Sequence, residues 1–243
     1  MSMKVINDLL DYNNLKIVQD TNYFSFSLDS VLLANFVSLN KCDKNILDIG
    51  TGNAPIPMIL SLKSNAKIHA FEIQGEIYQL AKESIEINKL DTRIKLYNDN
   101  IKNIGEYFKP EFFDVIVTNP PYFKIFKNSK LNIEKIKAIA RHEIHLNLDE
   151  LLSISSKYLK NNGVFAMVYR TDRITEVLSQ MSKYRLEPKR IIFIFSKVNT
   201  KSNLFLVEGI KNAKSGVKSI EYIISHENNG DYTDIIKNMF HIG

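Results

Sequence analysis

The sequence predicts an α/β fold, with a mostly parallel sheet of seven strands, helices on both faces and one antiparallel edge strand. Short apolar runs of strand length alternate along the chain with segments whose apolar residues recur at helical spacing. A glycine-rich turn, residues 50–52, joins one of these strands to a helix. The last two predicted strands, residues 191–195 and 203–208, have no helix between them, so they should be antiparallel neighbours.

The first half of the chain predicts strands and helices in alternation around the glycine turn. Strands are expected at residues 45–49, 67–73 and 94–97. The helix after the turn begins at Pro55, because proline is tolerated in a first helical turn. A later helix, residues 76–88, has an apolar face made of Ile77, Leu80, Ala81, Ser84 and Ile87. Near the N-terminus, Ser27 can cap a helix whose apolar face is Leu28, Val31, Leu32 and Phe36.

The second half continues the alternation. A strand is expected at residues 113–117, and a helix from Leu148 to Leu159 should end at the left-handed cap signal Asn161-Asn162-Gly163. The strand 164–169 follows. Thr171 and Asp172 then open a helix whose buried side is Ile174, Val177, Leu178 and Met181. Such alternation implies right-handed crossovers and a ligand site beyond the carboxyl ends of the strands.

The composition is that of an ordinary globular protein. The 243 residues are 44% hydrophobic and 24% charged, and no repeat or linker divides them, so we expect one domain, residues 1–243. A net charge of +5 favours polyanionic partners only slightly. The single cysteine, Cys42, excludes an intramolecular disulfide and a cysteine-cluster metal site, and we expect no metal. No stretch reaches the ~18 apolar residues of a membrane span, so we expect a cytoplasmic protein.

The chain is organised around Asn119-Pro120-Pro121-Tyr122, which follows the apolar run 113–117. Neither proline can donate to a strand ladder, so the chain must leave the sheet extended, with carbonyls and the Asn119 amide uncommitted. An amide oxygen beside a carbonyl can accept both hydrogens of one exocyclic amino group, while Tyr122 offers a flat face to a heterocycle. The arrangement suits an adenine amine.

Three further strand ends carry residues suited to a nucleoside-containing cofactor. Gly50 and Gly52 allow a ligand to approach the backbone, but Pro55 replaces the third glycine of the dinucleotide fingerprint and so weakens a nicotinamide interpretation. Glu72, at the end of the second strand, can chelate a ribose diol. Asp99, after the third strand, can accept from an adenine amino group.

Two basic segments are candidates for phosphate contacts, although such segments are often only solvated loops. One is the segment 123–145, a basic flap that contains Lys124, Lys127, Lys130 and Arg141. The other is a loop near the C-terminus that contains Lys211, Lys214 and Lys218.

In these motifs the chain resembles the class I S-adenosylmethionine-dependent methyltransferases, and among them the amino-methylating group with an Asn-Pro-Pro-Tyr signature. The resemblance spans nearly the whole chain and implies a Rossmann-like fold. Three shorter segments resemble the bacterial tRNA adenine-N6 methyltransferases, whose best-known members modify adenine 37 of a valine tRNA, beside the anticodon. These segments are Phe24-x-Phe26-Ser27-Leu28-Asp29-x-x-Leu32-Leu33, Arg141-His142-Glu143 and Val207-Glu208-Gly209.

Carried over residue by residue, the resemblance implies an S-adenosylmethionine site and a tRNA anticodon stem-loop as substrate. Gly50 and Gly52 would contact the methionine part of the cofactor, Glu72 its ribose and Asp99 its adenine. Asp48 and Asn119 would also line this site. Residues 1–40 would form a cap in which Phe26 and Ser27 close over the cofactor. The catalytic residues would be Asn119, Pro120, Pro121 and Tyr122.

Other functions share parts of this pattern. Protein-glutamine methyltransferases of release factors resemble the chain in Asn-Pro-Pro-Tyr, but they carry a helical substrate domain before the glycine turn. Methylation of DNA adenine or ribosomal RNA guanine is another alternative on the same fold. A non-catalytic RNA-binding module is less consistent with Asp48, Glu72, Asp99 and Asn119 together. The tRNA species and the oligomeric state stay open.

Overall fold

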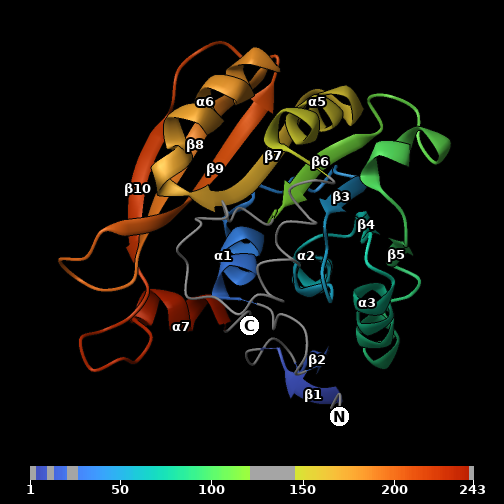
Figure 1. The fold of residues 1–243 in the computed structure, drawn as a ribbon, viewed down its shortest axis with the longest axis horizontal. Helices are drawn as coiled ribbons and strands as arrows, with labels where there is room; N and C mark the ends of the chain where they lie inside the picture. The colour runs from blue at the N-terminus through green and yellow to red at the C-terminus, as the bar shows by residue number, and fades with distance from the viewer. Residues whose placement is uncertain (1–3, 10–13, 21–26, 121–145, 241–243) are drawn as a thin grey trace, which may run out of the picture.

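The computed structural model describes residues 4–9, 14–20, 27–120 and 146–240. Its centre is an eight-stranded sheet in the order β10-β8-β9-β7-β6-β3-β4-β5 (Figure 1). The strands are β3 (Asn45–Ile49), β4 (Lys67–Phe71), β5 (Ile94–Tyr97), β6 (Phe113–Thr118), β7 (Leu159–Arg170), β8 (Leu186–Phe195), β9 (Ser202–Lys211) and β10 (Ser219–Ile224). The predicted α/β class is confirmed. The five adjacent strands β5, β4, β3, β6 and β7 all pair parallel with one another.

The reversed strand lies inside the sheet rather than at its edge. β9 is antiparallel to β8, as the sequence predicts, and also to β7 on its other side. The predicted edge position is therefore wrong, because β8 and then β10 extend the sheet beyond β9. β10 pairs parallel with β8 and is an eighth strand that the sequence analysis does not anticipate. Ile220 and Tyr222 are exposed on this edge strand, so its alternation gives no clear burial signal.

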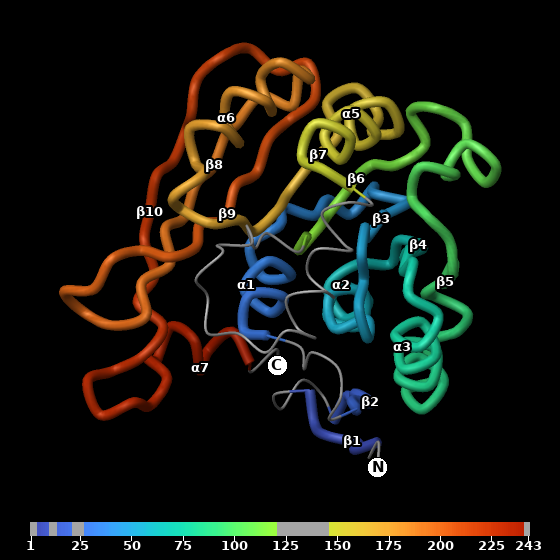
Figure 2. The backbone as a smooth tube through the Cα atoms, in the orientation of Figure 1, coloured from blue at the N-terminus to red at the C-terminus, as the bar shows by residue number. Residues whose placement is uncertain are grey.

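Helices cover both faces of the sheet. α5 and α6 lie on one face and α1 and α2 on the other, while α3 lies beside β5 (Figures 1 and 2). Two short 3₁₀ turns, η1 (Ile101–Glu106) and η2 (Thr171–Arg173), follow β5 and β7. The helices are α1 (Leu28–Phe36), α2 (Pro55–Lys63), α3 (Gly75–Ile87), α5 (Leu148–Tyr158), α6 (Ile174–Lys183) and α7 (Asp234–Phe240).

The buried face of α3 and the end of α5 differ from the prediction. Ile87 of α3 is 46% exposed and Ile85 is buried instead. The stripe that begins at Ile77 returns to the same face at positions eight residues later, and Ile87 lies off that stripe. α5 ends at Tyr158, before the cap that was expected at Asn162. Asn162 has a φ of 60°, but it lies in the irregular first part of β7.

A two-stranded hairpin precedes α1. β1 (Lys4–Asp8) pairs antiparallel with β2 (Lys16–Asp20), and β2 lies against α3. The Val18 backbone N–H donates to Ser84 Oγ at 2.9 Å, and the Asn88 side chain bonds to both the N–H and the carbonyl of Lys16. The sequence does not predict this hairpin.

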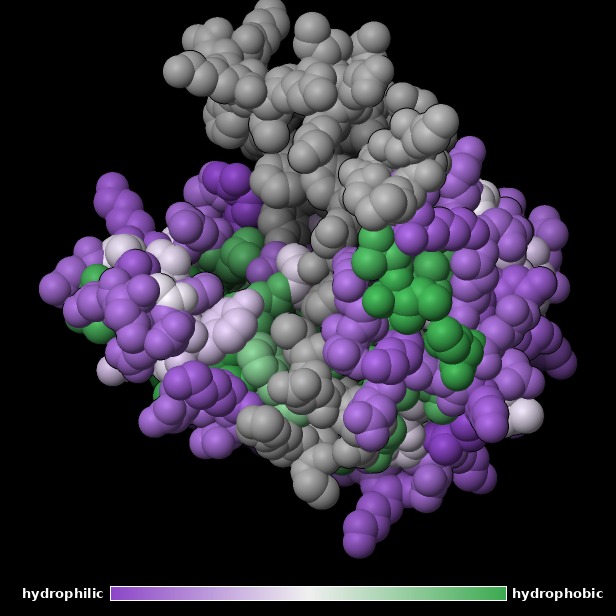
Figure 3. Space-filling view, turned by 90° about the horizontal axis from the view of Figure 1, so that it is seen from below, coloured by the Kyte–Doolittle hydropathy of each residue, from purple (hydrophilic) through white to green (hydrophobic). Residues whose placement is uncertain are grey.

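The core between the sheet and its helices is apolar. Phe71, Phe113, Phe165 and Phe205 are among the largest fully buried side chains, and they come from four different strands. The face seen from below is mostly hydrophilic where the chain is described, with a few apolar patches (Figure 3). Among the described residues, no helix has both the length and the apolar character needed to cross a membrane.

Candidate active site

The candidate site lies along the carboxyl ends of four neighbouring strands. Ile49 of β3 is in register with Thr118 of β6 on one side and with Phe71 of β4 on the other, and Phe71 is in register with Tyr97 of β5. The residues that follow these positions therefore lie side by side. In spatial order along the edge they are Asn98 and Asp99, then Glu72, then Gly50, then Asn119.

The glycine turn after β3 leaves open space above its backbone. Gly50 and Gly52 have φ angles of 72° and 60°, a left-handed conformation that favours glycine. A Cβ placed on either residue would meet no atom within 4 Å among the described residues. The N–H groups of Gly50 and Thr51 both donate to the Phe71 carbonyl, at 3.0 and 2.9 Å, and hold the turn against β4. The space above the turn suits a ligand that approaches the backbone closely.

The start of α2 is poorly suited to a phosphate. Pro55 and Pro57 both lie in its first turn, and Ala54 before them has a φ of 70°. A helix N-terminus binds phosphate through free backbone N–H groups, and proline has none. This geometry disfavours the pyrophosphate of a dinucleotide and is consistent with a nucleoside ligand that has no phosphate.

Glu72 joins the glycine turn to the loop after β4. Its Oε2 accepts from the Gly52 backbone N–H at 3.0 Å, and its Oε1 accepts from the Gln74 backbone N–H at 2.9 Å. The side chain of Asn98 donates to the Glu72 carbonyl at 2.9 Å, which adds β5 to this network. Burial raises the pKa of Glu72, while the backbone bonds from Gln74 and Gly52 oppose that rise.

Asp48, the residue before the end of β3, carries a fully buried carboxyl group. Neither carboxyl oxygen has a hydrogen-bond partner among the described residues, nor does the nearby Thr51 hydroxyl. Burial raises the pKa of Asp48 to about 7, and the charge of Glu72 adds to the rise. A buried carboxyl group without a partner, next to a second one, favours a positively charged ligand.

The carboxylate of Asp99 accepts hydrogen bonds from residues that follow it closely in the chain. Its Oδ1 accepts from the Asn100 backbone N–H at 2.7 Å and from Asn103 Nδ2 at 2.8 Å, and its Oδ2 accepts from the Tyr107 hydroxyl at 2.8 Å. The bond from Tyr107 is the main cause that lowers the pKa of Asp99. The carboxylate therefore stays charged and fixed, with acceptor capacity left for one more donor.

Asn119 lies next to the glycine turn, where β6 ends. Its Nδ2 donates to the hydroxyl of Ser30 in α1 at 3.0 Å. The preceding Thr118 is buried, and its hydroxyl donates to the Ile49 carbonyl at 2.9 Å, which ties the end of β6 to β3. Ser30 thus accepts one of the two amide hydrogens, and the amide oxygen of Asn119 is an acceptor. Pro120 is half-buried beside it.

Ser27 is exposed at the start of α1, where its side chain makes no capping bond. The residues that lie outside the described part of the chain are Phe26, Pro121, Tyr122, Lys124, Lys127, Lys130 and Arg141.

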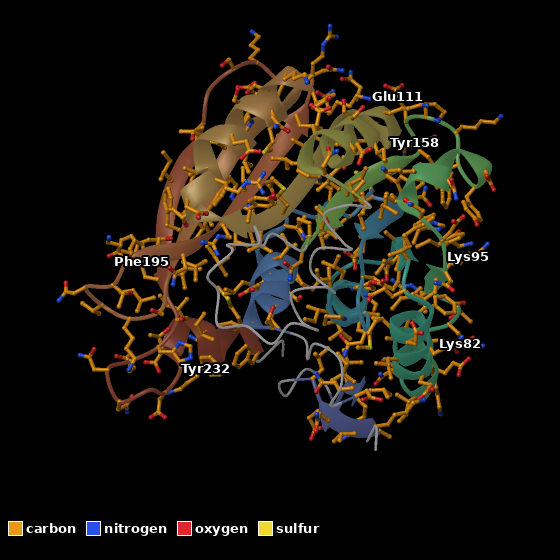
Figure 4. The ribbon with its side chains drawn as sticks, viewed as in Figure 1. Lys82, Lys95, Glu111, Tyr158, Phe195 and Tyr232 are labelled. Carbon is orange, nitrogen blue, oxygen red and sulfur yellow. The ribbon has the colours of Figure 1, made fainter. Side chains whose placement is uncertain are left out.

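The C-terminal lysines lie away from the site. Lys211 is only 8% exposed, and its Nζ donates to Glu111 Oε1 at 3.0 Å and to the Leu159 carbonyl at 2.7 Å, so it is not available to a phosphate. Lys214 and Lys218 are exposed, but their loop enters β10 beside Lys189, near the start of β8. The start of β8 lies at the end of the sheet opposite to the end where Asn119 lies. Glu111, at the top of Figure 4, marks this opposite edge.

The sequence does not predict two side chains that organise the site, Ser30 and Asn98. Both act on partners distant in sequence, and neither lies in a recognisable local motif.

Comparison with known proteins adds to this geometry. A family model described as a methyltransferase domain matches residues 40–240. The chain belongs to this methyltransferase family. The family uses S-adenosylmethionine as methyl donor. The cofactor has a nucleoside, no phosphate, and positive charges on its sulfonium and amino groups, so it fits the open glycine turn and the buried carboxyl groups of Asp48 and Glu72.

Relatives of this methyltransferase are found among curated proteins and solved structures. It is 28% identical over 79% of its length to a tRNA1(Val) (adenine(37)-N6)-methyltransferase of Phocaeicola vulgatus, of which 79% is covered. A protein of the same name from Bacteroides thetaiotaomicron is 26% identical, with 96% of this chain and 98% of the relative covered. In fold it is similar to a predicted O-methyltransferase from Agrobacterium tumefaciens, with a TM-score of 0.68, 18% identity, and 87% and 95% of the two chains covered.

Proposed function

We propose that this methyltransferase transfers the methyl group of S-adenosylmethionine to N6 of an adenine in tRNA, namely adenine 37 beside the anticodon. The observation that carries the proposal is the place of Asn119 at the end of β6, next to the glycine turn, where its amide supplies an acceptor oxygen. An acceptor is needed at that point to hold an amino group. Relatives that align over most of the chain are named tRNA1(Val) (adenine(37)-N6)-methyltransferases, which supports adenine in tRNA as the substrate.

The chemistry asks the protein mainly for alignment. Bound S-adenosylmethionine supplies an electrophilic methyl group on a positively charged sulfur. The adenine amine is a poor nucleophile, because its lone pair is delocalised into the ring. Hydrogen bonds from the amine to Asn119 Oδ1 and the Pro120 carbonyl would favour a pyramidal nitrogen that is aimed at the methyl group. No strong general base is needed, since the methylated nitrogen becomes acidic and can lose its proton to solvent.

The N-terminal region, residues 1–40, is proposed as a cap over the cofactor within a single domain. Two contacts support this role. Asn53, in the glycine turn, donates from Nδ2 to the Val18 carbonyl of β2 at 3.1 Å. Ser30 of α1 contacts Asn119. The N-terminal segments thus reach both the cofactor side and the target side of the site.

The basic flap is proposed to bind the phosphates of the anticodon stem-loop through Lys124, Lys127, Lys130 and Arg141. Because Lys211 is buried, and Lys214 and Lys218 lie at the opposite edge, we leave these three out of the contact surface near the target base. With tRNA as substrate, the enzyme would act in the cytoplasm.

Methyl transfer to unmodified tRNA tests the proposal directly. Total tRNA is incubated with the enzyme and isotopically labelled S-adenosylmethionine, digested, and analysed by mass spectrometry of nucleosides. Labelled N6-methyladenosine is the expected product, and its position follows from sequencing the labelled fragments. In a parallel incubation that contains a release factor, labelled methylglutamine together with unlabelled tRNA would favour the protein-glutamine alternative instead.

A further inference from the structure

A hydrogen bond between Tyr107 and Asp99 closes the segment that follows β5. The Tyr107 hydroxyl lies 2.8 Å from Asp99 Oδ2. A phenol can both donate and accept, but an ionised carboxylate can only accept, so the hydroxyl is the donor in this pair. Asp99 is ionised at neutral pH, because this bond and a second one from Asn103 lower the pKa of its carboxyl group. The chemistry of the two groups therefore fixes the direction of the bond.

The two oxygens of the Asp99 carboxylate are held unequally. Oδ1 accepts from the Asn100 backbone N–H at 2.7 Å and from Asn103 Nδ2 at 2.8 Å. Among the described residues, Oδ2 accepts only from Tyr107. Each carboxylate oxygen has about two acceptor sites, so those of Oδ1 are filled and one is left on Oδ2. A further donor, such as the amino group of an adenine, would therefore bind the oxygen that Tyr107 holds.

The ring of Tyr107 is anchored at the carboxyl edge of the sheet, although it is 44% exposed. It packs edge to face against the ring of Tyr97, the last residue of β5, and that of Phe71, the last residue of β4, with centroid distances of 4.9 and 5.6 Å. Phe71 and Tyr97 are buried and stacked on each other. Packing against two rings that strands hold in place limits the movement of the Tyr107 hydroxyl.

Adenine is the part of S-adenosylmethionine that Asp99 is proposed to bind, through its 6-amino group. Resting on this role of Asp99, and not on the identity of the methyl acceptor, we infer that Tyr107 is a positioning residue for cofactor recognition. Its hydroxyl holds Asp99 Oδ2 where the amino group donates and so makes the site selective for a purine that carries this group. Without Tyr107, the bonds at Oδ1 still hold one oxygen, but Oδ2 loses its only partner in the described chain.

Two compounds that differ only in this amino group test the inference. S-adenosylhomocysteine carries it, and the 6-deamino purine analogue of that compound has hydrogen in its place. Calorimetric titration without tRNA gives the ratio of the two affinities. Wild type should prefer the amino compound about 10-fold or more, the range for one hydrogen bond to a charged group. Tyr107→Phe keeps the ring and removes the hydroxyl, so the ratio should fall about 3- to 10-fold through weaker binding of the amino compound.

Tyr97→Phe is the matched control. It also removes a hydroxyl from this group of rings, but that hydroxyl contacts His69 Nδ1 at 3.1 Å and not Asp99. A packing defect in either variant would lower both affinities by the same factor, so the ratio of affinities should stay at the wild-type value in Tyr97→Phe. Asp99→Ala removes the acceptor itself and should bring the ratio close to one.

A fall in the ratio that is confined to Tyr107→Phe and Asp99→Ala supports the inference. Equal affinities of wild type for the two compounds would overturn both the role of Asp99 and that of Tyr107. An unchanged ratio in Tyr107→Phe, or an equal fall in Tyr97→Phe, would overturn the role of Tyr107 alone. The titration needs no tRNA, so a failure of the proposed function is detected separately, by the absence of labelled N6-methyladenosine.

Discussion

The backbone N–H of Gly52 donates to Glu72 Oε2 at 3.0 Å, so a single carboxylate links the glycine turn after β3 to the end of β4. The same carboxylate accepts from the Gln74 N–H through its other oxygen. Glu72 is 4% exposed, and the bonds hold it at the point where a cofactor ribose would lie. Its role in shaping the turn and its role in binding are therefore coupled.

Glu72→Ala should weaken cofactor binding by at least tenfold. The change removes an acceptor from the site and leaves the Gly52 and Gln74 N–H groups without their partner, which costs about 1–3 kcal/mol for each unsatisfied group. Calorimetric titration with S-adenosylmethionine or its demethylated product measures the loss. Glu76→Ala is the control, because Glu76 is an exposed glutamate in the first turn of α3. Equal affinity in Glu72→Ala and wild type would contradict the site assignment.

The raised pKa of Asp48 predicts that the stability of the protein depends on pH. Its folded pKa of about 7 lies above the ordinary value of 3.8, so the folded state holds the proton more tightly than the unfolded state does. The free energy of unfolding, relative to Asp48→Asn, should therefore fall as pH rises from about 4 to about 7 and then level off. The rise in pKa corresponds to roughly 4 kcal/mol at most. Urea unfolding of both proteins across this range measures the difference.

The free energy of unfolding also depends on pH through His69, with the opposite sign, and the comparison with Asp48→Asn cancels this contribution. Burial lowers the pKa of His69 to about 4, so His69 makes the protein more stable as pH rises through that region, in both proteins alike. Bound cofactor should reduce the Asp48 effect, since its positive charge favours the ionised carboxylate. A flat difference between the two proteins would show that Asp48 has a partner outside the described residues.

Asn119→Ala should separate binding from chemistry. The change removes an acceptor for the adenine amine but leaves the glycine turn and Glu72 in place. We expect a roughly 10²- to 10³-fold loss in single-turnover methyl transfer, with tRNA and cofactor affinities close to those of wild type. Near-normal turnover would mean that the motif is only a rigid turn.

Tyr122 should contribute to binding of the target adenine. Tyr122→Ala removes the stacking surface for an adenine turned out of the anticodon loop, worth about 1–3 kcal/mol, and should weaken substrate binding as well as the rate. Tyr122→Phe keeps the ring and should have a mild effect. Equilibrium binding beside single-turnover kinetics measures both, and equal losses in the two variants would argue for the hydroxyl rather than the ring.

The flap should determine how tRNA binding depends on salt. Replacing Lys124, Lys127 and Lys130 by alanine should lower tRNA affinity and flatten the slope of log affinity against log salt, by about 0.7–0.9 for each lost phosphate contact. Lys214→Ala with Lys218→Ala is the matched control, because these exposed lysines lie at the opposite edge of the sheet. A steeper effect in the control pair would place the RNA on that edge.

Much of the fold could be predicted because its signals are local. The strands 45–49 and 94–97 are apolar runs with defined ends, and the structure places β3 and β5 at these residues. The glycine turn and Asn119 each follow such a run directly, so their place at the carboxyl edge follows from the parallel arrangement. In these positions backbone preference and hydrophobic period agree with the final structure.

What the sequence determined by itself was the order of strands and helices, the strand ends that bear Gly50, Glu72 and Asn119, and the chemistry that those residue types allow. The tertiary structure decided the internal position of β9, the burial of Lys211 and the contact between Ser30 and Asn119. Each of these depends on partners dozens of residues away, because a pairing or a hydrogen bond between distant segments leaves no periodic pattern in either one. Only when the sheet brings those segments together do such partners become neighbours.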